Sequence, residues 1–197
     1  MVTAVVLGSY LCAEPVQDLV DRVKKIRMGQ VYEPEPGDLI VFTGGADVSP
    51  WMYQAKPHHT TYSDPPRDKV EAMIYHAAKR QGIPMVGICR GAQFLNVMNG
   101  GTLLQDVPGH RGGHLMYTAE GETMEVTSTH HQMIRMADGA VLYGWAEEHR
   151  EGGVPDPEVV YYPATKSLCV QYHPEYGSKS DDMWKYFQSK VKELLIC

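Results

Sequence analysis

Residues 84–93 read PMVGICRGAQ, and this stretch determines the fold class that we expect for the chain. The run at 84–88 is short and apolar, which is typical of a strand buried inside a sheet. A helix-like segment follows as far as Asn99, and the two are joined through the pattern Gly-x-Cys-x-Gly at 87–91. Such a sharp turn forces its central residue into an unfavourable backbone conformation, and the flanking glycines remove Cβ atoms that would collide. The sequence therefore predicts a strand, a tight turn with Cys89 at its centre, and a helix.

The position of Cys89 makes it a candidate nucleophile. The pattern is the cysteine counterpart of the nucleophile elbow, which holds a reactive side chain above a sheet. Unpaired amides and the positive dipole at the start of the following helix favour the thiolate, which is the reactive form, and Arg90 adds positive charge nearby. The alternative is that Cys89 is a small core residue between two packing glycines, because free cysteine is among the most buried residue types.

The segments that precede this stretch alternate between strand and helix patterns. Residues 2–8 and 38–42 are apolar runs bordered by glycine or turn residues, so we expect buried strands there, the first of them central in the sheet. Between them lies an apolar stripe at helical spacing, formed by Val16, Leu19, Val20, Val23 and Ile26. This stripe predicts an amphipathic crossover helix. Residues 67–81 predict a second helix, which ends at Gly82 because glycine readily takes the left-handed conformation of a helix end.

The pattern changes after Gly100. Short alternating segments separated by Gly- and Pro-rich loops predict antiparallel strands at 122–128, 140–145 and 158–162. Residues 168–172 form another buried strand pattern, and an amphipathic segment at 181–195 predicts a closing helix. Strands that alternate with helices indicate a single α/β domain over residues 1–197. We expect a central, mostly parallel sheet flanked by helices, with a small antiparallel excursion.

Composition and charge exclude several classes of protein. The chain has 197 residues, 43% hydrophobic and 21% charged, as in ordinary soluble globular proteins. Its 18 basic and 24 acidic side chains give a net charge of −6, and no basic run could neutralise phosphates, so we expect no nucleic acid partner. Residues 1–11 lack the charged start of a signal peptide, and no stretch has transmembrane length, so we expect no membrane partner. Four widely spaced cysteines predict a reducing, cytoplasmic location.

A candidate base and its orienter follow the predicted strand at 168–172, in the tripeptide His173-Pro174-Glu175. Catalytic groups of α/β sheets come from the C-terminal ends of strands, where Cys89 also lies. Residues two apart in an extended segment point to the same side, which lets the Glu175 carboxylate reach the distal imidazole nitrogen and fix its tautomer. The imidazole could then take the thiol proton. The alternative is a solvated turn, because these three residue types are common on surfaces.

These two motifs make the chain resemble the class I, triad-type glutamine amidotransferases. The segments that carry the likeness are GICRGAQ at 87–93 and QYHPE at 171–175. Within that superfamily the chain looks closest to the γ-glutamyl hydrolase and γ-glutamyl-γ-aminobutyrate hydrolase branch. The segments that carry this second likeness are GGADVSP at 44–50 with Tyr53, DPPRD at 64–68 and the substrate-side segment STHHQ at 128–132.

The resemblance implies a flavodoxin-like fold and a catalytic triad of Cys89, His173 and Glu175. It implies hydrolysis of a γ-glutamyl amide through a glutamyl thioester: ammonia or an amine leaves first, and water then releases glutamate. No cofactor is implied. The backbone amides of Gly45 and Arg90 would form the oxyanion hole. The residues expected to contact substrate are Gly44, Gln93, His130 and Gln132. For Gln93, an amide in the core or on a helix surface remains the open alternative.

The remaining histidines and cysteines predict no further chemistry. The histidines, at positions 58, 59, 110, 114, 130, 131 and 149, lack co-ligands at metal-binding spacing, so we expect loop histidines and no metal. HRGGH at 110–114 lies where the family has a flap over the site, which leaves a substrate contact open. We expect Cys12 and Cys169 to be inert core residues and Cys197 to be a terminal thiol.

Three functions are compatible with the sequence. The first is a glutaminase that breaks the side-chain amide of glutamine and passes ammonia to a separate synthetase subunit. The second is a free-standing hydrolase of γ-glutamyl amines or peptides, which the segments at 47–50 and 67–68 favour. The third is a catalytically inactive domain kept for binding or regulation, and the intact motifs argue against it. In the first two the partner is a small γ-glutamyl molecule, glutamine in the first.

Overall fold

The computed structural model describes residues 1–149 and 155–196, so Cys197 lies outside the described residues. The strands are β1 (Thr3–Leu7), β2 (Arg22–Ile26), β3 (Asp38–Phe42), β4 (Met85–Ile88), β5 (Thr102–Leu104), β6 (Arg111–Thr118), β7 (Thr123–Thr129), β8 (Met133–Arg135), β9 (Val141–His149), β10 (Pro155–Tyr162) and β11 (Ser167–Val170). The helices are α1 (Glu14–Gln17), α2 (Pro65–Gln81), α3 (Arg90–Met98) and α4 (Asp182–Val191), the last continued by a π-helical turn at Lys192–Ile196.

The described part of the chain forms one nine-stranded mixed sheet in the order β2-β1-β3-β4-β11-β10-β9-β6-β7. The strands from β2 to β11 in this order are parallel to one another. From β11 onward the neighbouring strands are antiparallel, and they extend the same sheet. β5 and β8 pair with each other outside it. The predicted α/β class, with helices flanking a central sheet, is confirmed.

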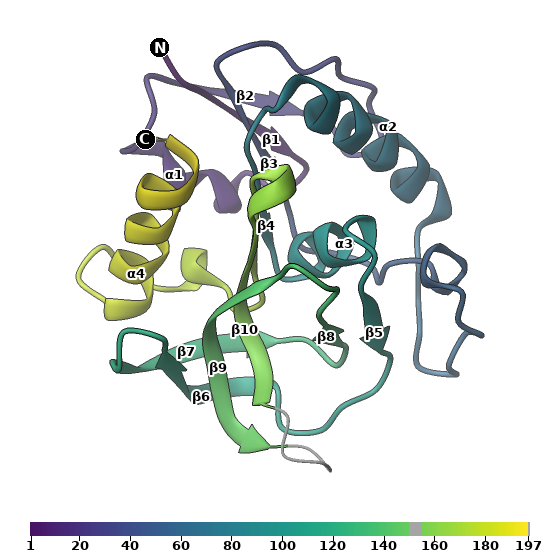
Figure 1. The fold of residues 1–197 in the computed structure, drawn as a ribbon, viewed down its shortest axis with the longest axis vertical. Coiled ribbons are helices and arrows are strands. Elements are labelled where there is room, and N and C mark those ends of the chain that lie inside the picture. Colours follow the sequence, from purple (N-terminus) through teal and green to yellow (C-terminus); the bar gives the residue numbers. More distant parts are fainter. Residues whose placement is uncertain (150–154, 197) are drawn as a thin grey trace.

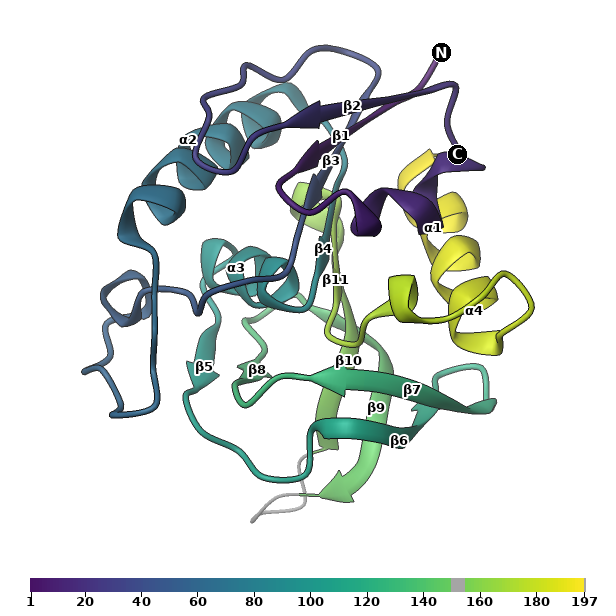
Figure 2. The same cartoon turned by 180° about the vertical axis from the view of Figure 1, so that it is seen from behind.

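Helices cover both faces of the parallel part of the sheet (Figures 1 and 2). α2 and α3 lie on one face, and α1 and α4 lie on the other. Side chains alternate between the two layers along β1: Ala4 and Val6 belong to the core with α1 and α4, whereas Val5 and Leu7 belong to the core with α2 and α3. A strand that is buried on both faces needs apolar residues at every position, which explains the continuous apolar runs in the sequence.

α2 and α3 lie close to the ranges that the sequence indicates, with α2 beginning two residues earlier, at Pro65, and α3 ending one residue earlier, at Met98. The Asp64 side chain accepts a hydrogen bond from the backbone amide of Arg67 at 3.1 Å, so it caps α2. At the other end Gly82 has a φ of 65°, the left-handed conformation that the sequence predicts for it. α3 begins directly after Cys89, and this places the predicted strand, turn and helix in their expected order.

The crossover helix predicted from the stripe at residues 16–26 is wrong. α1 ends at Gln17, and residues 22–26 instead form β2, which pairs in parallel with β1. β2 is an edge strand whose Lys24 and Lys25 are exposed, and charged side chains of this kind protect a sheet edge from pairing with other chains. The apolar residues at 16–26 have helical spacing, but backbone pairing of residues 22–26 with β1 determines the structure there. Such pairing does not depend on the side-chain pattern. β1 is therefore next to an edge and not central.

The C-terminal half agrees with the sequence in most segments. β7, β9 and β10 correspond to the three predicted antiparallel strands, and β11 and α4 to the last strand and helix. β6 is additional: it contains Gly112 and Gly113, which obscure a strand pattern, and its pairing with β7 and β9 is long-range. No helix among the described residues is long and apolar enough to cross a membrane.

Candidate active site

Three neighbouring parallel strands end at the same edge of the sheet and carry the predicted site residues there. β3 leads into the loop of Gly44 and Gly45, β4 leads into Cys89, and β11 is followed closely by His173. The sheet order β3-β4-β11 makes these three strand ends adjacent. The expectation that Cys89 and His173 meet at the C-terminal edge of the sheet is therefore confirmed at the level of the backbone.

The backbone at Cys89 has the strained conformation that the sequence predicts. Its φ is 53° and its ψ is −112°, an uncommon region for a residue with a side chain. The glycines on either side are required by close packing: a Cβ on Gly87 would collide with the backbone of Gly91, and a Cβ on Gly91 would collide with the carbonyl group of Phe42. The turn thus holds Cys89 at the start of α3 in one fixed orientation.

His173 is held from both sides of its imidazole ring. Nδ1 donates to Oε1 of Glu175 at 2.8 Å, and Nε2 lies 3.0 Å from Oγ1 of Thr129. Tyr176 stacks on the ring with a centroid distance of 4.4 Å. Glu175 lies in a short 3-10 turn, not in the extended segment expected, yet its carboxylate reaches the predicted nitrogen. The structure therefore brings the proposed base and its orienter together.

Cys89 and His173 both border Gly44. A Cβ built on Gly44 would lie 3.4 Å from Cε1 of His173 and 3.8 Å from Cβ of Cys89. Both groups therefore lie within van der Waals distance of position 44. Burial alone would lower the pKa of His173, but hydrogen bonding and charge interaction with Cys89 and Glu175 outweigh it and raise this pKa to about 10.

Cys12 contacts Glu175 although the sequence predicted an inert core residue. Its Sγ donates to Oε1 of Glu175 from 3.3 Å, the same oxygen that accepts from His173. Burial, together with the charge of Glu175, raises the pKa of Cys12 well above its ordinary value, so this thiol stays protonated and remains a donor. The contact joins segments that are far apart in the sequence, and no local pattern indicates it.

A buried ionic network fixes the loop that carries Gly44 and Gly45. Arg67 donates from Nη2 to the carbonyl of Thr43 at 2.8 Å and from Nη1 to the carbonyl of Gly44 at 3.0 Å. Its Nε donates to Glu71 at 2.7 Å. Gly45 has a φ of 138°, and a Cβ there would collide with the Arg67 guanidinium. The close approach of Arg67 therefore requires glycine at position 45.

The side chain of Arg90 belongs to the same network, which corrects one expectation. Arg90 pairs with Asp68 and Glu71, and these three side chains are almost completely buried. Its guanidinium is thus directed at two carboxylates, one of which it shares with Arg67. Only the backbone of Arg90, at the first position of α3, is left for the role expected from the sequence. The spacing of Arg67 and Glu71, four residues apart on one helix, was the available sequence indication of this network.

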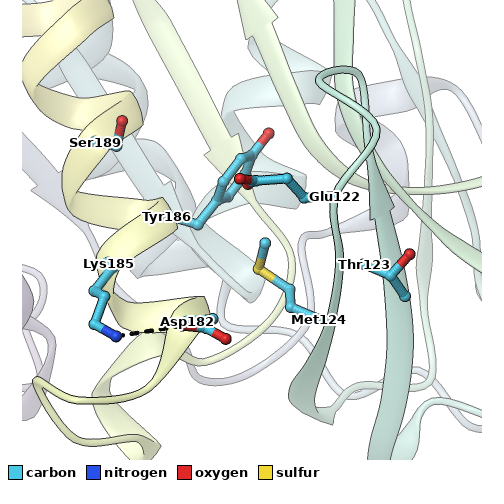
Figure 3. Close-up of a pocket in the computed structure, with 7 residues that line it drawn as sticks. All are labelled: Glu122, Thr123, Met124, Asp182, Lys185, Tyr186 and Ser189. Carbon is cyan, nitrogen blue, oxygen red and sulfur yellow. Dashed lines mark hydrogen bonds and ion pairs between the residues drawn. The ribbon is translucent and has the colours of Figure 1, made fainter.

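A pocket of about 260 Å³ opens beside Cys89. This volume is below the usual range for drug-sized ligands and suits a group the size of one amino acid. The lining residues include five of the predicted site residues, Gly45, Cys89, Gln93, His130 and Gln132. A larger hollow of about 530 Å³ lies between β7 and α4 (Figure 3), but its lining includes none of the predicted site residues.

Hydrogen bonds fix Gln93 and His130 on the wall of this pocket. Gln93 is buried, and its Nε2 donates to the carbonyl of Gln132 at 3.1 Å and to Oε1 of Gln171 at 3.2 Å. Nδ1 of His130 lies 2.9 Å from the same carbonyl oxygen of Gln132. Burial lowers the pKa of His130 to about 4, so its imidazole is neutral at neutral pH. Gln93 is thus both a core amide and a residue of the pocket wall.

Comparison with known proteins identifies related sequences. A family model described as Peptidase C26 matches residues 36–117. A Mycobacterium tuberculosis protein named "Putative glutamine amidotransferase" is 36% identical over 175 residues, which cover 77% of this chain and 54% of that protein. A Lactococcus lactis protein named "Putative glutamine amidotransferase-like protein YvdE" is 33% identical over 179 residues, which cover 80% of this chain and 72% of that protein. The chain thus spans about half the length of the mycobacterial relative.

Comparison with solved structures supports the fold. A chain in the structure titled "Structure of PurLQS from Thermotoga maritima" superposes with a TM-score of 0.68 at 18% identity, over 98% of this chain and 99% of that chain. At this level of identity the likeness shows a shared fold. The flavodoxin-like architecture of the class I glutamine amidotransferases, expected from the sequence, is confirmed.

Proposed function

We propose that this chain hydrolyses γ-glutamyl amide bonds, with Cys89 as nucleophile, His173 as base and Glu175 as orienter. The chain belongs to the class I glutamine amidotransferase superfamily, which includes the Peptidase C26 family. The observation that carries the proposal is the convergence of Cys89, which follows β4, with His173 and Glu175, which follow the neighbouring strand β11. Cys89 has a strained backbone and lines the pocket, and His173 is fixed by a hydrogen bond of 2.8 Å to Glu175.

The first half of the reaction forms a thioester. His173 takes the proton of the Cys89 thiol, and the sulfur attacks the γ-carbonyl carbon of the substrate. The carbonyl oxygen becomes an oxyanion, which the backbone amides of Gly45 and Arg90 stabilise in the tetrahedral intermediate. Collapse breaks the C–N bond, and the proton on His173 passes to the leaving nitrogen. Nε2 of His173 suits this task because it lies next to Thr129, which lines the pocket.

The second half releases glutamate. A water molecule gives a proton to His173 and attacks the thioester carbon, again through an oxyanion held by the same two amides. When the C–S bond breaks, the sulfur recovers its proton from His173. Glu175 does not change its protonation in either half, because its role is to fix the imidazole tautomer and to stabilise the imidazolium.

The pocket wall supports a glutamyl group as the recognised part of the substrate. Gln93, Gln132 and Asp47 present amides and a carboxylate around the space beside Cys89. A carboxylate in this position suits the α-ammonium group of a γ-glutamyl moiety, and the amides can pair with its polar groups. Because the pocket is small, the leaving group would lie near its mouth. The pocket therefore restricts the size of the glutamyl part more than the size of the leaving group.

A glutaminase that supplies ammonia to a separate synthetase subunit is the first candidate for the physiological role. The amidotransferase fold accounts for 98% of these residues, so the acceptor site of a synthetase would lie outside the 197 residues. A free-standing γ-glutamyl hydrolase is the second candidate, and the match of residues 36–117 to Peptidase C26 favours it. Both roles use a small-molecule substrate, and neither role needs nucleic acid, a membrane or an organic cofactor.

Turnover measurements separate these candidates. Purified protein is incubated with glutamine and with a panel of γ-glutamyl amines and peptides, and released glutamate is measured. We expect release by the native protein and by a Cys169→Ala control, which removes a buried thiol from β11, and none by Cys89→Ala. Robust release from γ-glutamyl amines supports the free-standing hydrolase, whereas slow release from glutamine alone supports the subunit of a synthetase. Equal release by native and Cys89→Ala protein would contradict the mechanism, whereas a Cys89 that resists alkylation by a glutamine-mimicking electrophile would support the inactive binding domain.

A further inference from the structure

Three buried side chains from distant segments meet behind the wall of the pocket. His110 directly precedes β6, His130 directly follows β7, and Glu158 lies in β10. Their side chains come from parts of the chain that the antiparallel strands bring together, as the ribbon shows (Figure 2). The exposed fractions are 2% for His110, 4% for His130 and 0% for Glu158. Two imidazoles and a carboxylate in a closed interior are unusual without a partner that satisfies them.

The hydrogen bonds of the described residues leave one atom of each side chain unsatisfied. Nδ1 of His110, Nε2 of His130 and Oε2 of Glu158 are buried and have no hydrogen-bond partner there. Ligand atoms of the three residues lie within 4.8 Å of one another. Oε1 of Glu158 is 3.6 Å from Nδ1 of His110 and 3.9 Å from Nε2 of His130, too far for good hydrogen bonds. Two ligands of one zinc ion, each at about 2.0–2.1 Å, are separated by roughly 3.3 Å in a tetrahedral site.

The other nitrogen of each histidine is held as in established metal sites. Nε2 of His110 lies 3.0 Å from Oδ2 of Asp156, and Nδ1 of His130 lies 2.9 Å from the carbonyl of Gln132. These acceptors fix the tautomers, so that the lone pairs of Nδ1 in His110 and Nε2 in His130 remain available. Metal-binding histidines almost always donate their second N–H to a carboxylate or a backbone carbonyl in this way.

Protonation alone does not satisfy the cluster. A proton on Nδ1 of His110 would point toward Glu158, but it would leave Nε2 of His130 and one carboxylate oxygen without partners. Nε2 of His114 lies 3.0 Å from Oε1 of Glu158. His114 therefore orients this carboxylate and cannot also form a hydrogen bond with Nε2 of His130. A divalent cation at the centre would satisfy all three atoms at once.

We propose that His110, His130 and Glu158 bind one divalent transition-metal ion, with zinc as the best match. Imidazole nitrogen and carboxylate oxygen are zinc ligands, and three protein ligands leave one position of a tetrahedral site for a water molecule. The sequence predicted no metal because the ligands come from three separate segments without a local spacing. The site has a consequence for the pocket: His130 is held to the carbonyl of Gln132, and both residues line the space beside Cys89. The ion would therefore fix this part of the pocket wall.

Metal titration tests the proposal independently of the triad. The full chain is freed of metal with a chelator, and Zn²⁺ is added in competition with a chromogenic chelator, in native and Cys89→Ala protein. We expect one tight site per chain in both, because the site does not use the sulfur. Glu158→Gln, which preserves shape, should remove that tight site. Asp156→Asn should weaken affinity by about 10–100-fold, as loss of an outer carboxylate does in metal sites. His76→Ala, an exposed histidine on α2, should leave affinity unchanged.

Two measurements on protein without substitutions in the cluster keep the test decisive if the variants fail to fold. Co²⁺ substitution followed by X-ray absorption should show nitrogen and oxygen ligands with imidazole scattering and no sulfur. Zn²⁺ should also raise the midpoint of thermal unfolding of the metal-free native protein. The proposal is overturned if native protein binds no stoichiometric metal, if the bound ion has a sulfur ligand, or if folded Glu158→Gln protein binds Zn²⁺ as tightly as native protein.

Discussion

The pKa of His173 distinguishes a working catalytic pair from two side chains that merely share a core. Interaction with Cys89 and Glu175 outweighs burial and raises this pKa to about 10. We predict that Cys89→Ala lowers the pKa of His173, because the variant removes one of the two groups that favour the imidazolium. Titration of the imidazole signals by NMR measures it in native and variant protein. The same pKa in both would show that Cys89 does not interact with the base.

The same shift predicts how stability depends on pH. Because the folded-state pKa of His173 is raised above 6.5, protonated His173 favours the folded state. This contribution is complete below about pH 6.5 and is lost as the pH rises toward 10. The free energy of unfolding in urea should therefore fall more steeply over this range in native protein than in His173→Gln. Parallel pH profiles for the two proteins would contradict the assigned ion pair.

Glu175 acts through His173, so its replacement should damage turnover without ending it. Glu175→Gln can still accept a hydrogen bond from Nδ1, but it cannot stabilise the imidazolium. We expect kcat to fall by about 10²–10⁴-fold with little change in KM. His173→Ala should show no measurable glutamate release. Glu33→Gln, which makes the same chemical change at an exposed position, serves as the control and should retain native kinetics. Native kcat in Glu175→Gln would remove Glu175 from the triad.

Local sequence motifs pointed to the three residues of the proposed triad but not to their surroundings. Cys89 was predicted because its flanking glycines are needed for the turn, and His173 because it follows a buried strand. Cys12 was missed because its contact with Glu175 joins the first and last parts of the chain. Thr129, beside Nε2 of His173, was missed for the same reason.

At the scale of elements, the network of Arg67, Asp68, Glu71 and Arg90 joins α2, α3 and the loop after β3. We predict that Asp68→Asn destabilises the fold by about 3–5 kcal/mol, because it leaves a buried guanidinium without one of its two carboxylates. Urea unfolding measures the loss. Lys185→Ala, which removes an exposed ion pair on α4, is the control and should change stability by about 1 kcal/mol or less. Similar effects of the two substitutions would mean that the network contributes no more than a surface pair.

The elements also show where sequence patterns fail. Helical spacing of apolar residues predicted α2 and α4 because their stripes pack against the sheet. The same spacing at residues 16–26 was misleading, since β2 is held by backbone pairing with β1 and buries little besides Ile26. β6 was missed because Gly112 and Gly113 obscure a strand pattern and because its pairing with β7 and β9 is long-range. Edge and antiparallel strands depend on partners that a local pattern does not reveal.

For the whole molecule, the order of strands decides whether a site exists. β3, β4 and β11 are neighbours although β11 is far from β4 in the sequence, and this places Gly45, Cys89 and His173 at one edge. The α/β class could be predicted from alternating strands and helices. The sheet order could not, because it depends on which backbones pair, and it entered the sequence analysis only through resemblance to a known family.

The two apolar cores share one sheet, so we propose that residues 1–197 unfold as a single domain. β1, β3, β4 and β11 contribute side chains to both cores, which makes loss of one layer costly for the other. Denaturant unfolding followed by far-UV circular dichroism and by tryptophan fluorescence should give coincident transitions. Separate midpoints for the two signals would show that the antiparallel strands unfold independently of the parallel part.

Covalent labelling with an electrophilic analogue of glutamine, followed by intact-mass measurement and peptide mapping, tests the central claim most directly. We predict one adduct per chain, located on Cys89, formed more slowly in the presence of glutamine or in His173→Ala and absent in Cys89→Ala. The account would be contradicted if Cys89 stayed unmodified, or if Cys12 or Cys169 reacted as readily as Cys89.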